Sequence, residues 1–344
     1  MAPAIYLSHP SSLLHDTGEH PERAARIVAI EQELERHDWF GMERVEAPRV
    51  AADTLTAVHP VRYVRAIDEL CAAGGGAIDA DTVVVEASYE AALRAAGGAV
   101  ALVDRLMDGT ARTGFSALRP PGHHAEAARA MGFCLFGNVA VAARHALDAH
   151  GAGRVLVLDW DVHHGNGTND VFHATDEVLF VSIHQSPLYP GTGPAGDVGS
   201  GVGTGFTVNL PVPPGAGDAD YLSLLEHVVV PLALAYEPRL ILISAGFDAH
   251  RDDPLAGVAL TEAGFAAMTG TMRRLAAELE APLGGVLEGG YDLRSLAAST
   301  AATLQALTAS APPPAPDGLP LAPLAQSAAA RLAARWPTLA AARG

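Results

Sequence analysis

The stretch Arg154-Val155-Leu156-Val157-Leu158-Asp159-Trp160-Asp161-Val162-His163-His164-Gly165 (residues 154–165) decides the fold class of this chain. Its first half is a continuous run of branched apolar residues, which is typical of a strand buried on both faces of a parallel sheet. Its second half places carboxylates and imidazoles directly after that run. Because ligands of open α/β sheets gather at the carboxyl ends of the strands, the stretch predicts both an α/β fold and a site.

Six further apolar runs have the same character, and longer helix-like segments separate them. This alternation predicts a parallel sheet covered by helices on both faces. The seven expected strands are 4–8, 114–118, 154–158, 178–183, 206–210, 240–244 and 283–287. The expected helices include one whose first turn holds Pro21, one that Ser88 caps, and four over 138–150, 218–235, 261–280 and 293–308.

The domain organisation follows from where this pattern stops. No composition shift, long linker or internal repeat interrupts the first 308 residues, so we expect one catalytic domain over residues 1–310. Residues 311–323 are rich in proline and cannot continue a helix. We expect residues 311–344 to form a proline-rich connector and a C-terminal helix that packs on the same domain.

The composition indicates an acidic protein of a reducing compartment. Acidic residues number 39 against 22 basic ones, and the net charge of -17 opposes binding to nucleic acid or anionic membrane. Cys71 and Cys134 are too few and too far apart for a disulfide framework or a cysteine metal cluster. The first residues lack a signal-peptide pattern, and no apolar run approaches the roughly 18 residues of a membrane span. We expect a soluble, cytoplasmic protein, with a homo-oligomer left open.

Two strand ends supply candidate metal ligands. Alternate side chains of an extended segment share one side, so Asp159, Asp161 and His163 are expected to project together. A second apolar strand runs into residues 244–248 and delivers Asp248. Asp161, His163 and Asp248 form a set of two carboxylates and one imidazole, which leaves a coordination position for water or substrate. The structural alternative is a helix cap and a surface histidine pair.

Residues 119–125, Arg-Pro-Pro-Gly-His-His-Ala, follow another strand and carry a candidate general base. The two prolines stiffen the loop, and a general base must be held within hydrogen-bond reach of the water that it deprotonates. Histidine suits this role because its ordinary pKa lies near neutral pH, and Asp159 or Asn166 could orient His123 and His124. A buried, hydrogen-bonded histidine pair is the structural alternative.

Residues 287–291, Leu-Glu-Gly-Gly-Tyr, follow a further apolar strand. The two glycines allow a sharp turn and a close approach to a ligand. Tyr291 could then donate its hydroxyl to the oxyanion that forms as an amide bond opens. A tyrosine after a glycine turn is commonly a packing residue, which is the alternative for this motif.

These four motifs, in this order, resemble the histone deacetylase family, and their amino-acid sequences are similar to those of its class II branch. Segments 132–147, 178–193 and 203–211 share the resemblance, which extends over roughly residues 5–308. The resemblance implies the arginase-deacetylase fold, a single α/β domain with an eight-stranded parallel sheet and helices on both faces. It also implies zinc, one ion per chain, and one or two structural potassium ions.

Matching positions imply roles for individual residues. The implied zinc ligands are Asp161, His163 and Asp248. The implied catalytic residues are His124 as general base, His123 as its electrostatic partner supported by Asp159, Tyr291 as electrophilic donor, and Asn166 beside His124, where class I members carry an aspartate. The implied substrate-binding residues are Gly132, Phe133, Tyr189, Leu255 and Gly289. The implied potassium sites are Asp159, Asp161, His163, Ser182 and Ile183, and a second one at Phe172, Thr175, Val178 and Phe206.

The resemblance implies a zinc-dependent deacetylase whose partner is an acetylated lysine peptide or a small acylated amine. Leu255 stands where relatives that prefer acetylated polyamines carry a glutamate, which favours acyl-lysine peptides. The aspartate that holds the peptide backbone in some members has no clear counterpart near Val83 to Ala87. Acetylpolyamine hydrolysis and a non-catalytic acyl-lysine binder are the alternatives, whereas a dinuclear manganese ureohydrolase requires more bridging acids than these strand ends supply. The sequence leaves open whether the ion is zinc or ferrous iron, which acyl group is removed, and what the oligomeric state is.

Overall fold

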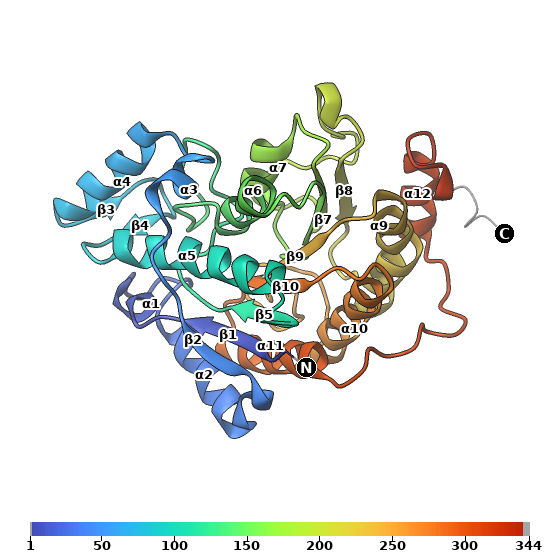
Figure 1. Ribbon diagram of the computed structural model, residues 1–344, viewed down its shortest axis with the longest axis horizontal. Coiled ribbons are helices and arrows are strands. Elements are labelled where there is room, and N and C mark those ends of the chain that lie inside the picture. The colour runs from blue at the N-terminus through green and yellow to red at the C-terminus, as the bar shows by residue number, and fades with distance from the viewer. Residues whose placement is uncertain (1, 340–344) are drawn as a thin grey trace.

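The centre of the protein is one eight-stranded sheet in which every pairing is parallel (Figure 1). The structure, a computed structural model, describes residues 2–339. The strands follow the order β2-β1-β5-β10-β9-β6-β7-β8. They are β1 Ala4–Ser8, β2 Glu43–Glu46, β5 Thr113–Ser116, β6 Val155–Asp159, β7 Val178–Gln185, β8 Thr207–Val212, β9 Leu240–Ala245 and β10 Leu283–Leu287. The predicted fold class is confirmed.

All seven strands expected from the sequence are present, with ends that shift by up to two residues. The eighth strand, β2, was not expected, because Glu43-Arg44-Val45-Glu46 is not an apolar run. It lies at the edge of the sheet and pairs only with β1, so its charged side chains stay exposed. An edge strand tolerates such side chains because they also discourage pairing with another chain.

A small antiparallel hairpin stands apart from the main sheet. Its strands are β3 Gly76–Ala77 and β4 Val83–Val84, and neither was expected from the sequence. Asp79 accepts backbone N–H bonds from Asp81 at 3.1 Å and from Thr82 at 2.7 Å, which shapes the loop between the two strands. This loop reaches the substrate pocket described below.

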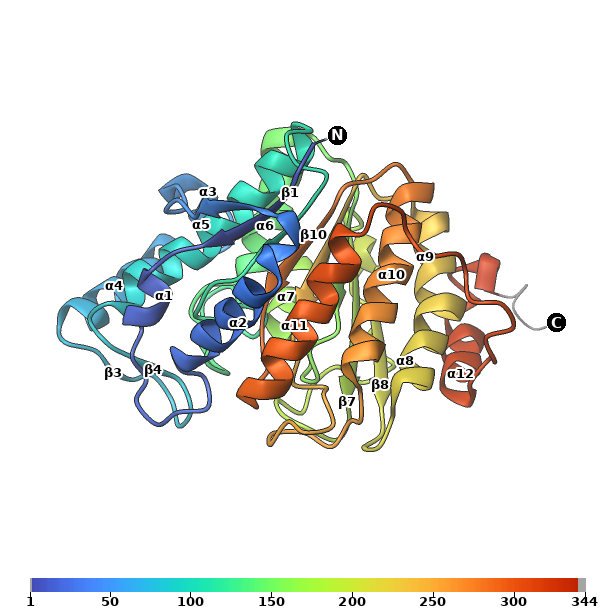
Figure 2. The same ribbon diagram turned by 90° about the horizontal axis from the view of Figure 1, so that it is seen from below.

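Helices cover both faces of the main sheet. They are α1 Ser11–Leu14, α2 Ala25–Arg36, α3 Ala52–Thr56, α4 Val61–Ala72, α5 Ser88–Met107, α6 Asn138–His150, α7 Asn166–Phe172, α8 Asp218–Leu224, α9 Val230–Tyr236, α10 Glu262–Glu278, α11 Leu293–Thr308 and α12 Pro323–Leu332. Figure 2 shows α2, α11, α10 and the α8–α9 segment in a row over one face, whereas α5 and α6 lie on the other.

Alternate residues of each central strand enter two separate cores. In β6, Leu156 and Leu158 join the core under α2, α10 and α11, whereas Val155 and Val157 join the core under α5 and α6. Both faces of the strand are therefore apolar, which is why the sequence shows a continuous apolar run instead of an alternating one.

Two expected helix starts are wrong. Pro21 does not lie in the first turn of α2, which begins four residues later at Ala25. Ser88 does not cap α5 but is its first residue. Its hydroxyl is engaged elsewhere, because it accepts the N–H of Val85 at 2.8 Å and contacts Nδ1 of His15 at 2.7 Å. Thr261 and Asp292, in contrast, cap α10 and α11 with their side chains.

One segment differs from the expectation about membrane spans. Asp218–Tyr236 comprises 19 residues with a mean hydropathy of 1.2, so by length and composition alone it could cross a membrane. Half of the apolar window is buried inside the protein, and Tyr221, Leu225 and Leu232 lie in the core under α10. Core helices of soluble proteins also meet this length and composition test.

The segment after α11 contacts the rest of the chain through α12 and through residues on either side of it. Arg331 donates to the backbone carbonyl of Asn209 at 2.8 Å, and Trp336 donates its indole N–H to Gly205 at 3.0 Å. Ala325 and Leu332 are buried in the core that α8 and α10 share. The predicted division at residue 310 stays a prediction, and residues 340–344 of the predicted tail lie outside the described residues.

Candidate active site

The carboxyl ends of four neighbouring strands bring the predicted site residues together. β5, β10, β9 and β6 are consecutive in the sheet. The histidine pair of residues 119–125 follows β5, residues 288–291 follow β10, Asp248 follows β9, and residues 160–163 follow β6. Because parallel strands end at the same edge, motifs that are far apart in sequence meet here.

Asp161, His163 and Asp248 form a compact and buried set. The Nδ1 atom of His163 lies 3.1 Å from Oδ1 of Asp161 and 3.2 Å from Oδ2 of Asp248. One ligand atom from each residue lies within 4.8 Å of the others, and all three side chains are buried. The structure thus brings together the three residues that the sequence predicts as metal ligands.

Backbone groups hold the other carboxylate oxygens in place. The N–H of Gly289 donates to Oδ2 of Asp161 at 2.8 Å, and the N–H of Val162 donates to Oδ1 of Asp248 at 2.9 Å. A Cβ atom at Gly289 would lie 2.0 Å from Oδ2 of Asp248, and one at Gly246 would lie 2.0 Å from Oδ2 of Asp161. Both positions therefore require glycine, because any side chain would displace a carboxylate.

The two carboxylates of this set favour a cation beside them. Burial and the charge of Asp161 raise the pKa of Asp248 to about 7. Burial opposes an imidazolium, yet hydrogen bonds with Asp161 and Asp248 raise the pKa of His163 to about 10. Both shifts indicate that positive charge is favoured between the two carboxylates. Two carboxylates and an imidazole are donors that Zn²⁺ accepts, so these residues fit the predicted ion.

The two histidines of residues 119–125 have different partners. Nδ1 of His123 lies 3.0 Å from Oδ2 of Asp159, and Nδ1 of His124 lies 2.8 Å from Oδ1 of Asn166. Burial opposes protonation of His123, but Asp161 and Asp159 raise its pKa well above the ordinary value. Burial, followed by the charge of His123, lowers the pKa of His124 well below the ordinary value. His124 is therefore neutral at pH 7, as a general base must be.

Tyr291 is fixed from three directions. Its backbone N–H donates to Oδ2 of Asp253 at 2.7 Å, and Nε of Arg26 donates to the carbonyl of Gly290 at 2.6 Å. The Arg26 guanidinium carbon lies 5.0 Å from the centre of the Tyr291 ring, and the Phe133 ring meets that ring edge-on at 5.6 Å. Burial, followed by the charge of Asp248, raises the pKa of Tyr291 well above the ordinary value. The phenol therefore keeps the proton that it would donate.

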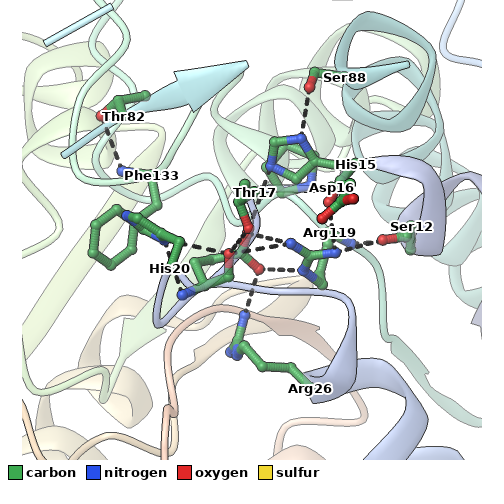
Figure 3. A network of polar contacts seen from close by, with 12 residues as sticks. Ser12, His15, Asp16, Thr17, His20, Arg26, Thr82, Ser88, Arg119 and Phe133 are labelled. Carbon is green, nitrogen blue, oxygen red and sulfur yellow. Dashed lines mark hydrogen bonds and ion pairs between the residues drawn. The ribbon is translucent and has the colours of Figure 1, made fainter. Parts of the chain in front are cut away.

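A buried network of ion pairs and hydrogen bonds holds the Arg26 side chain in place (Figure 3). The Glu22 carboxylate accepts from Nη1 of Arg26 at 3.0 Å and from Nη2 of Arg119 at 2.7 Å. Nη1 of Arg119 also donates to the backbone carbonyl of Ser12 at 2.6 Å. Burial disfavours the carboxylate, but the two guanidiniums, Arg119 foremost, hold the pKa of Glu22 well below the ordinary value. The network ties the N-terminal segment to the loops of the site.

A pocket of about 210 Å³ leads to these groups. It is lined by Asp81, His124, Gly132, Phe133, His163, Leu188, Tyr189, Leu255 and Tyr291. Four of the five residues predicted to contact substrate are therefore in the lining. Gly289 is not, because its backbone faces the carboxylates of the metal set. A larger cavity of about 480 Å³ near Arg112 and Arg273 lies away from all of these residues, so its size does not mark the site.

Several residues of the site were not assigned from the sequence. Asp81 lines the pocket although no acidic counterpart was expected near Val83, two residues further on. Glu288 accepts from the N–H of Gly122 at 2.7 Å and from the hydroxyl of Ser244 at 3.1 Å, which joins three of the strand ends. Other supporting residues without an assigned role were Glu22, Arg26, Arg119 and Asp253. Arg119 and Glu288 lie within the quoted motifs, which is the signal that could have identified them.

The residues of the two predicted potassium sites lie beside β6, β7 and β8. Asp159 pairs with Ser182 in the register of β6 and β7, and Ile183 is the next residue. In the second set, the carbonyl of Phe172 accepts from the N–H of Thr175 at 3.3 Å, and that of Phe206 accepts from Phe180 at 2.8 Å. Val178 begins β7. These positions do not identify an ion, so both potassium sites stay predictions.

Comparison with known proteins agrees with this geometry. The histone deacetylase domain family matches residues 20–307. The chain is 40% identical over 325 residues to the chloroplastic histone deacetylase 14 of Arabidopsis thaliana, which covers 88% of this chain and 76% of that protein. It is 39% identical over 295 residues to a probable deacetylase of Archaeoglobus fulgidus, which covers 84% and 79%.

A solved structure shares the whole architecture. The crystal structure of the HDA15 HD domain matches with a TM-score of 0.92 at 38% identity, over 99% of this chain and 97% of that one. The family match spans more than half of the chain, and the matches of sequence and of structure both extend over most of it. This chain therefore belongs to the histone deacetylase family of hydrolases.

Proposed function

We propose that this protein is a zinc-dependent deacetylase that hydrolyses the amide of acetyl-lysine or of a closely related acylated amine. One observation carries the proposal. His124, His163 and Tyr291 line a single pocket, so a base, a metal ligand and a hydroxyl donor face the same small volume. Amide hydrolysis by a metalloenzyme needs these three functions around one carbonyl.

Asp161, His163 and Asp248 would hold the zinc ion. When bound, zinc supplies a Lewis acid that polarises the acyl carbonyl and makes a water molecule more acidic. Two carboxylate ligands donate more charge than neutral imidazoles would, which weakens that acidification. The protein must then supply its own base.

His124 takes a proton from the attacking water in this proposal. The neutral imidazole bonds through Nδ1 to Asn166, which leaves Nε2 as the acceptor. Tyr291 donates its hydroxyl to the acyl oxygen as negative charge develops there, and one such donor typically contributes about 3 kcal/mol to lowering the barrier. A protonated histidine of the pair then gives a proton to the departing amine.

The pocket walls support a lysine-like substrate. Phe133 and Tyr189 offer aromatic faces to a four-carbon aliphatic stem, and the charged or peptide part stays at the mouth. The carbonyl of Gly132 is a candidate acceptor for the substrate amide N–H. Leu255 is apolar and gives no carboxylate for the second ammonium group of a polyamine. Asp81 also lines the pocket and is a candidate acceptor for the N–H groups of a peptide.

A second candidate substrate class is the acetylated polyamines. A neighbouring pocket of about 320 Å³ is lined by Asp81 and Tyr189, which also line the substrate pocket, and by Asp79, Glu126 and Arg129. Three carboxylates against one guanidinium give this rim a negative balance, which favours a cationic tail of any kind. Peptides with basic residues and polyamines both have this property, so the rim alone does not distinguish them.

Steady-state kinetics with an acetyl-lysine peptide and with acetylspermidine tests the proposal. We expect hydrolysis of both by the zinc-loaded protein, with the larger kcat/KM for the peptide. Removal of zinc by a chelator should abolish the activity, and added Zn²⁺ should restore it. A larger kcat/KM for acetylspermidine would favour acetylated polyamines as the substrate class. Binding of the peptide without its hydrolysis would mean that the protein only binds acyl-lysine, and it would overturn the proposal.

A pair of variants identifies the metal site in the same experiment. Asp248→Asn removes a charged member of the set, so we expect loss of the bound zinc and of the activity. Asp252→Asn is the matched control, because this exposed aspartate lies four residues along the same loop and outside the set. Equal zinc content in both variants would contradict the assigned ligands.

A further inference from the structure

A second group of potential metal ligands lies outside the active site. Oδ1 of Asp104 lies 2.7 Å from Nε2 of His145 and 2.8 Å from Nε2 of His150. One ligand atom from each of the three residues lies within 4.8 Å of the others. The two imidazole rings meet nearly edge-on, with centres 5.4 Å apart and planes at 79°. Two imidazoles thus turn the same nitrogen toward one carboxylate oxygen.

The group sits at the opposite edge of the sheet from the active site. Asp104 lies near the end of α5, and His150 is the last residue of α6. The next strand begins a few residues after each helix, with β5 at Thr113 and β6 at Val155. The group therefore lies beside the strand beginnings, whereas the residues of the active site follow the strand ends. α5 and α6 pack against each other along the face that Figure 1 shows in cyan and green.

Neighbouring acids are occupied by other partners. Asp108 accepts the backbone N–H and the hydroxyl of Thr110 at 2.8 and 2.6 Å, and Asp148 pairs with Arg144 at 3.2 Å. Within residues 2–339, the potential ligand set at this place consists of Asp104, His145 and His150. Two imidazoles and one carboxylate form a donor set that suits Zn²⁺ and its neighbours among the transition metals better than Ca²⁺ or Mg²⁺.

The geometry needs only small movements to accept an ion. Metal–ligand distances of about 2.0–2.1 Å in a tetrahedral site place ligand atoms about 3.3 Å apart. The present separations of 2.7 and 2.8 Å from Asp104 must therefore open by roughly half an ångström. The side chains can move this far because they are 16%, 24% and 48% exposed for His145, His150 and Asp104. Partial exposure also leaves the fourth position to water.

An access route for an ion adjoins the group. His145 lines a surface pocket of about 340 Å³ that also contains Asp53 and Asp148. Asp148 is paired with Arg144, so the carboxylate of Asp53 and the net charge of -17 of the chain as a whole are what attract cations to this pocket. A hydrated divalent ion can therefore approach His145 without a rearrangement of the fold.

We propose that Asp104, His145 and His150 form a second metal site, which binds a divalent transition metal of the zinc class and ties the end of α5 to the end of α6. The metal would replace the two hydrogen bonds that Asp104 now accepts. It would act as a structural cross-link beside the strand beginnings, at the edge of the sheet remote from the reaction. The site is independent of the proposed deacetylase activity.

Zinc stoichiometry tests the proposal directly. Competition with a chromogenic chelator of known affinity would measure the equivalents of Zn²⁺ that the full-length protein binds. We expect two equivalents for the wild type and one for His145→Gln or His150→Gln. Loss of a direct ligand should weaken binding by more than the 10- to 100-fold that is typical of an outer-shell partner. The second equivalent should also raise the Tm of the wild type but not of these variants.

A matched control uses another histidine–aspartate pair. Nε2 of His173 lies 2.8 Å from Asp197 with similar partial exposure, and within residues 2–339 this pair belongs to no group of three potential ligands. His173→Gln should therefore keep both equivalents. If it lost the second equivalent as well, the bound zinc would be scattered over surface histidines and the proposed site would be wrong.

The Asp248→Asn background separates this site from the active site. In that variant we expect one equivalent, and His150→Gln added to it should remove that last equivalent. A wild type that binds a single equivalent, lost in Asp248→Asn, would overturn the second site and leave the deacetylase proposal intact. A second equivalent that survives in the His145→Gln/His150→Gln double variant would overturn it equally. Unchanged circular dichroism of the variants would show that the loss is not one of folding.

Discussion

Oδ1 of Asn166 lies 2.8 Å from Nδ1 of His124, and the orientation of this amide is fixed. The amide nitrogen of Asn166 donates to Glu126 at 2.9 Å, so its oxygen must face the imidazole. The hydrogen of neutral His124 therefore lies on Nδ1, and Nε2 is free to accept a proton. His123, the adjacent residue, bonds to the carboxylate of Asp159 instead. Neighbouring histidines of one motif thus have opposite electrostatic surroundings.

Asn166→Asp should move the pH dependence of the reaction. A carboxylate in place of the amide favours the imidazolium, so the pKa of His124 should rise from its lowered value. The base is then protonated at a higher pH, and the acid limb of kcat/KM against pH should shift upward. The pH profile for an acetyl-lysine substrate measures this shift.

Gln326→Glu serves as the control for added charge. Gln326 is exposed on α12, so its substitution changes the net charge equally without touching the site. Its acid limb should coincide with that of the wild type. If Asn166→Asp also left the limb in place, His124 would not be the group whose protonation limits the reaction.

Tyr291→Phe should lower kcat by about a hundredfold or more, because it removes one donor to the developing oxyanion. Zinc content should stay unchanged, since the proposed ligands are Asp161, His163 and Asp248. Tyr189→Phe is the matched control, because Tyr189 lines the same pocket and its ring is kept. Turnover of Tyr291→Phe at the rate of Tyr189→Phe would remove Tyr291 from the mechanism.

The sequence predicted the parts of this site that follow apolar strands. Asp161, His163 and Asp248 could be identified because each comes shortly after a run that can only be a buried strand, and parallel strands end at a common edge. The same reasoning could not find β2, whose four residues include three charged ones. An edge strand has no apolar signature, and only its pairing with β1 defines it.

The pairing that builds the buried ion network, unlike the place of Arg119 in a motif, could not be derived from the sequence. Glu22 and Arg119 are 97 residues apart, and neither position suggests a buried ion pair. Charged residues are ordinarily solvated, so a single sequence gives no reason to place them in the core. Their burial becomes apparent only in the fold, which brings one carboxylate, two guanidinium groups and several backbone carbonyls to one place.

Glu22→Gln should destabilise the protein strongly. The substitution leaves the buried guanidiniums of Arg26 and Arg119 without their carboxylate, and breaking a buried ion pair in this way costs about 3–5 kcal/mol. Urea unfolding of the two proteins measures the loss. Activity should fall as well, because Arg26 also holds the carbonyl of Gly290 next to Tyr291.

Glu33→Gln is the internal control for this prediction. Glu33 pairs with Arg36 at 2.6 Å on α2, but the arginine side chain is 70% exposed. Exposed pairs of this kind typically contribute about 0.5 kcal/mol or less. A similar loss in both variants would mean that burial does not set the strength of the Glu22 network.

Glu288→Gln should change how stability depends on pH. Burial raises the pKa of Glu288 to about 7, although the charge of His123 and the N–H groups of Gly122 and His123 oppose the rise. Between the ordinary pKa of 4.5 and about 7, the unfolded chain has lost this proton while the folded protein retains it. The contribution of Glu288 to stability therefore falls as the pH rises through this window. Glutamine cannot ionise and lacks this dependence.

The free energy of unfolding at pH 5 and pH 8 measures the effect. From pH 5 to pH 8 the wild type should lose about 2.5 kcal/mol relative to Glu288→Gln, given the two pKa values. The amide can still accept from Gly122 and donate to Ser244, so the contacts of the carboxyl group are largely preserved. Parallel pH profiles of the two proteins would mean that Glu288 is ionised in the folded state. In that case the positive charge of His123, and not burial, would determine the pKa of Glu288.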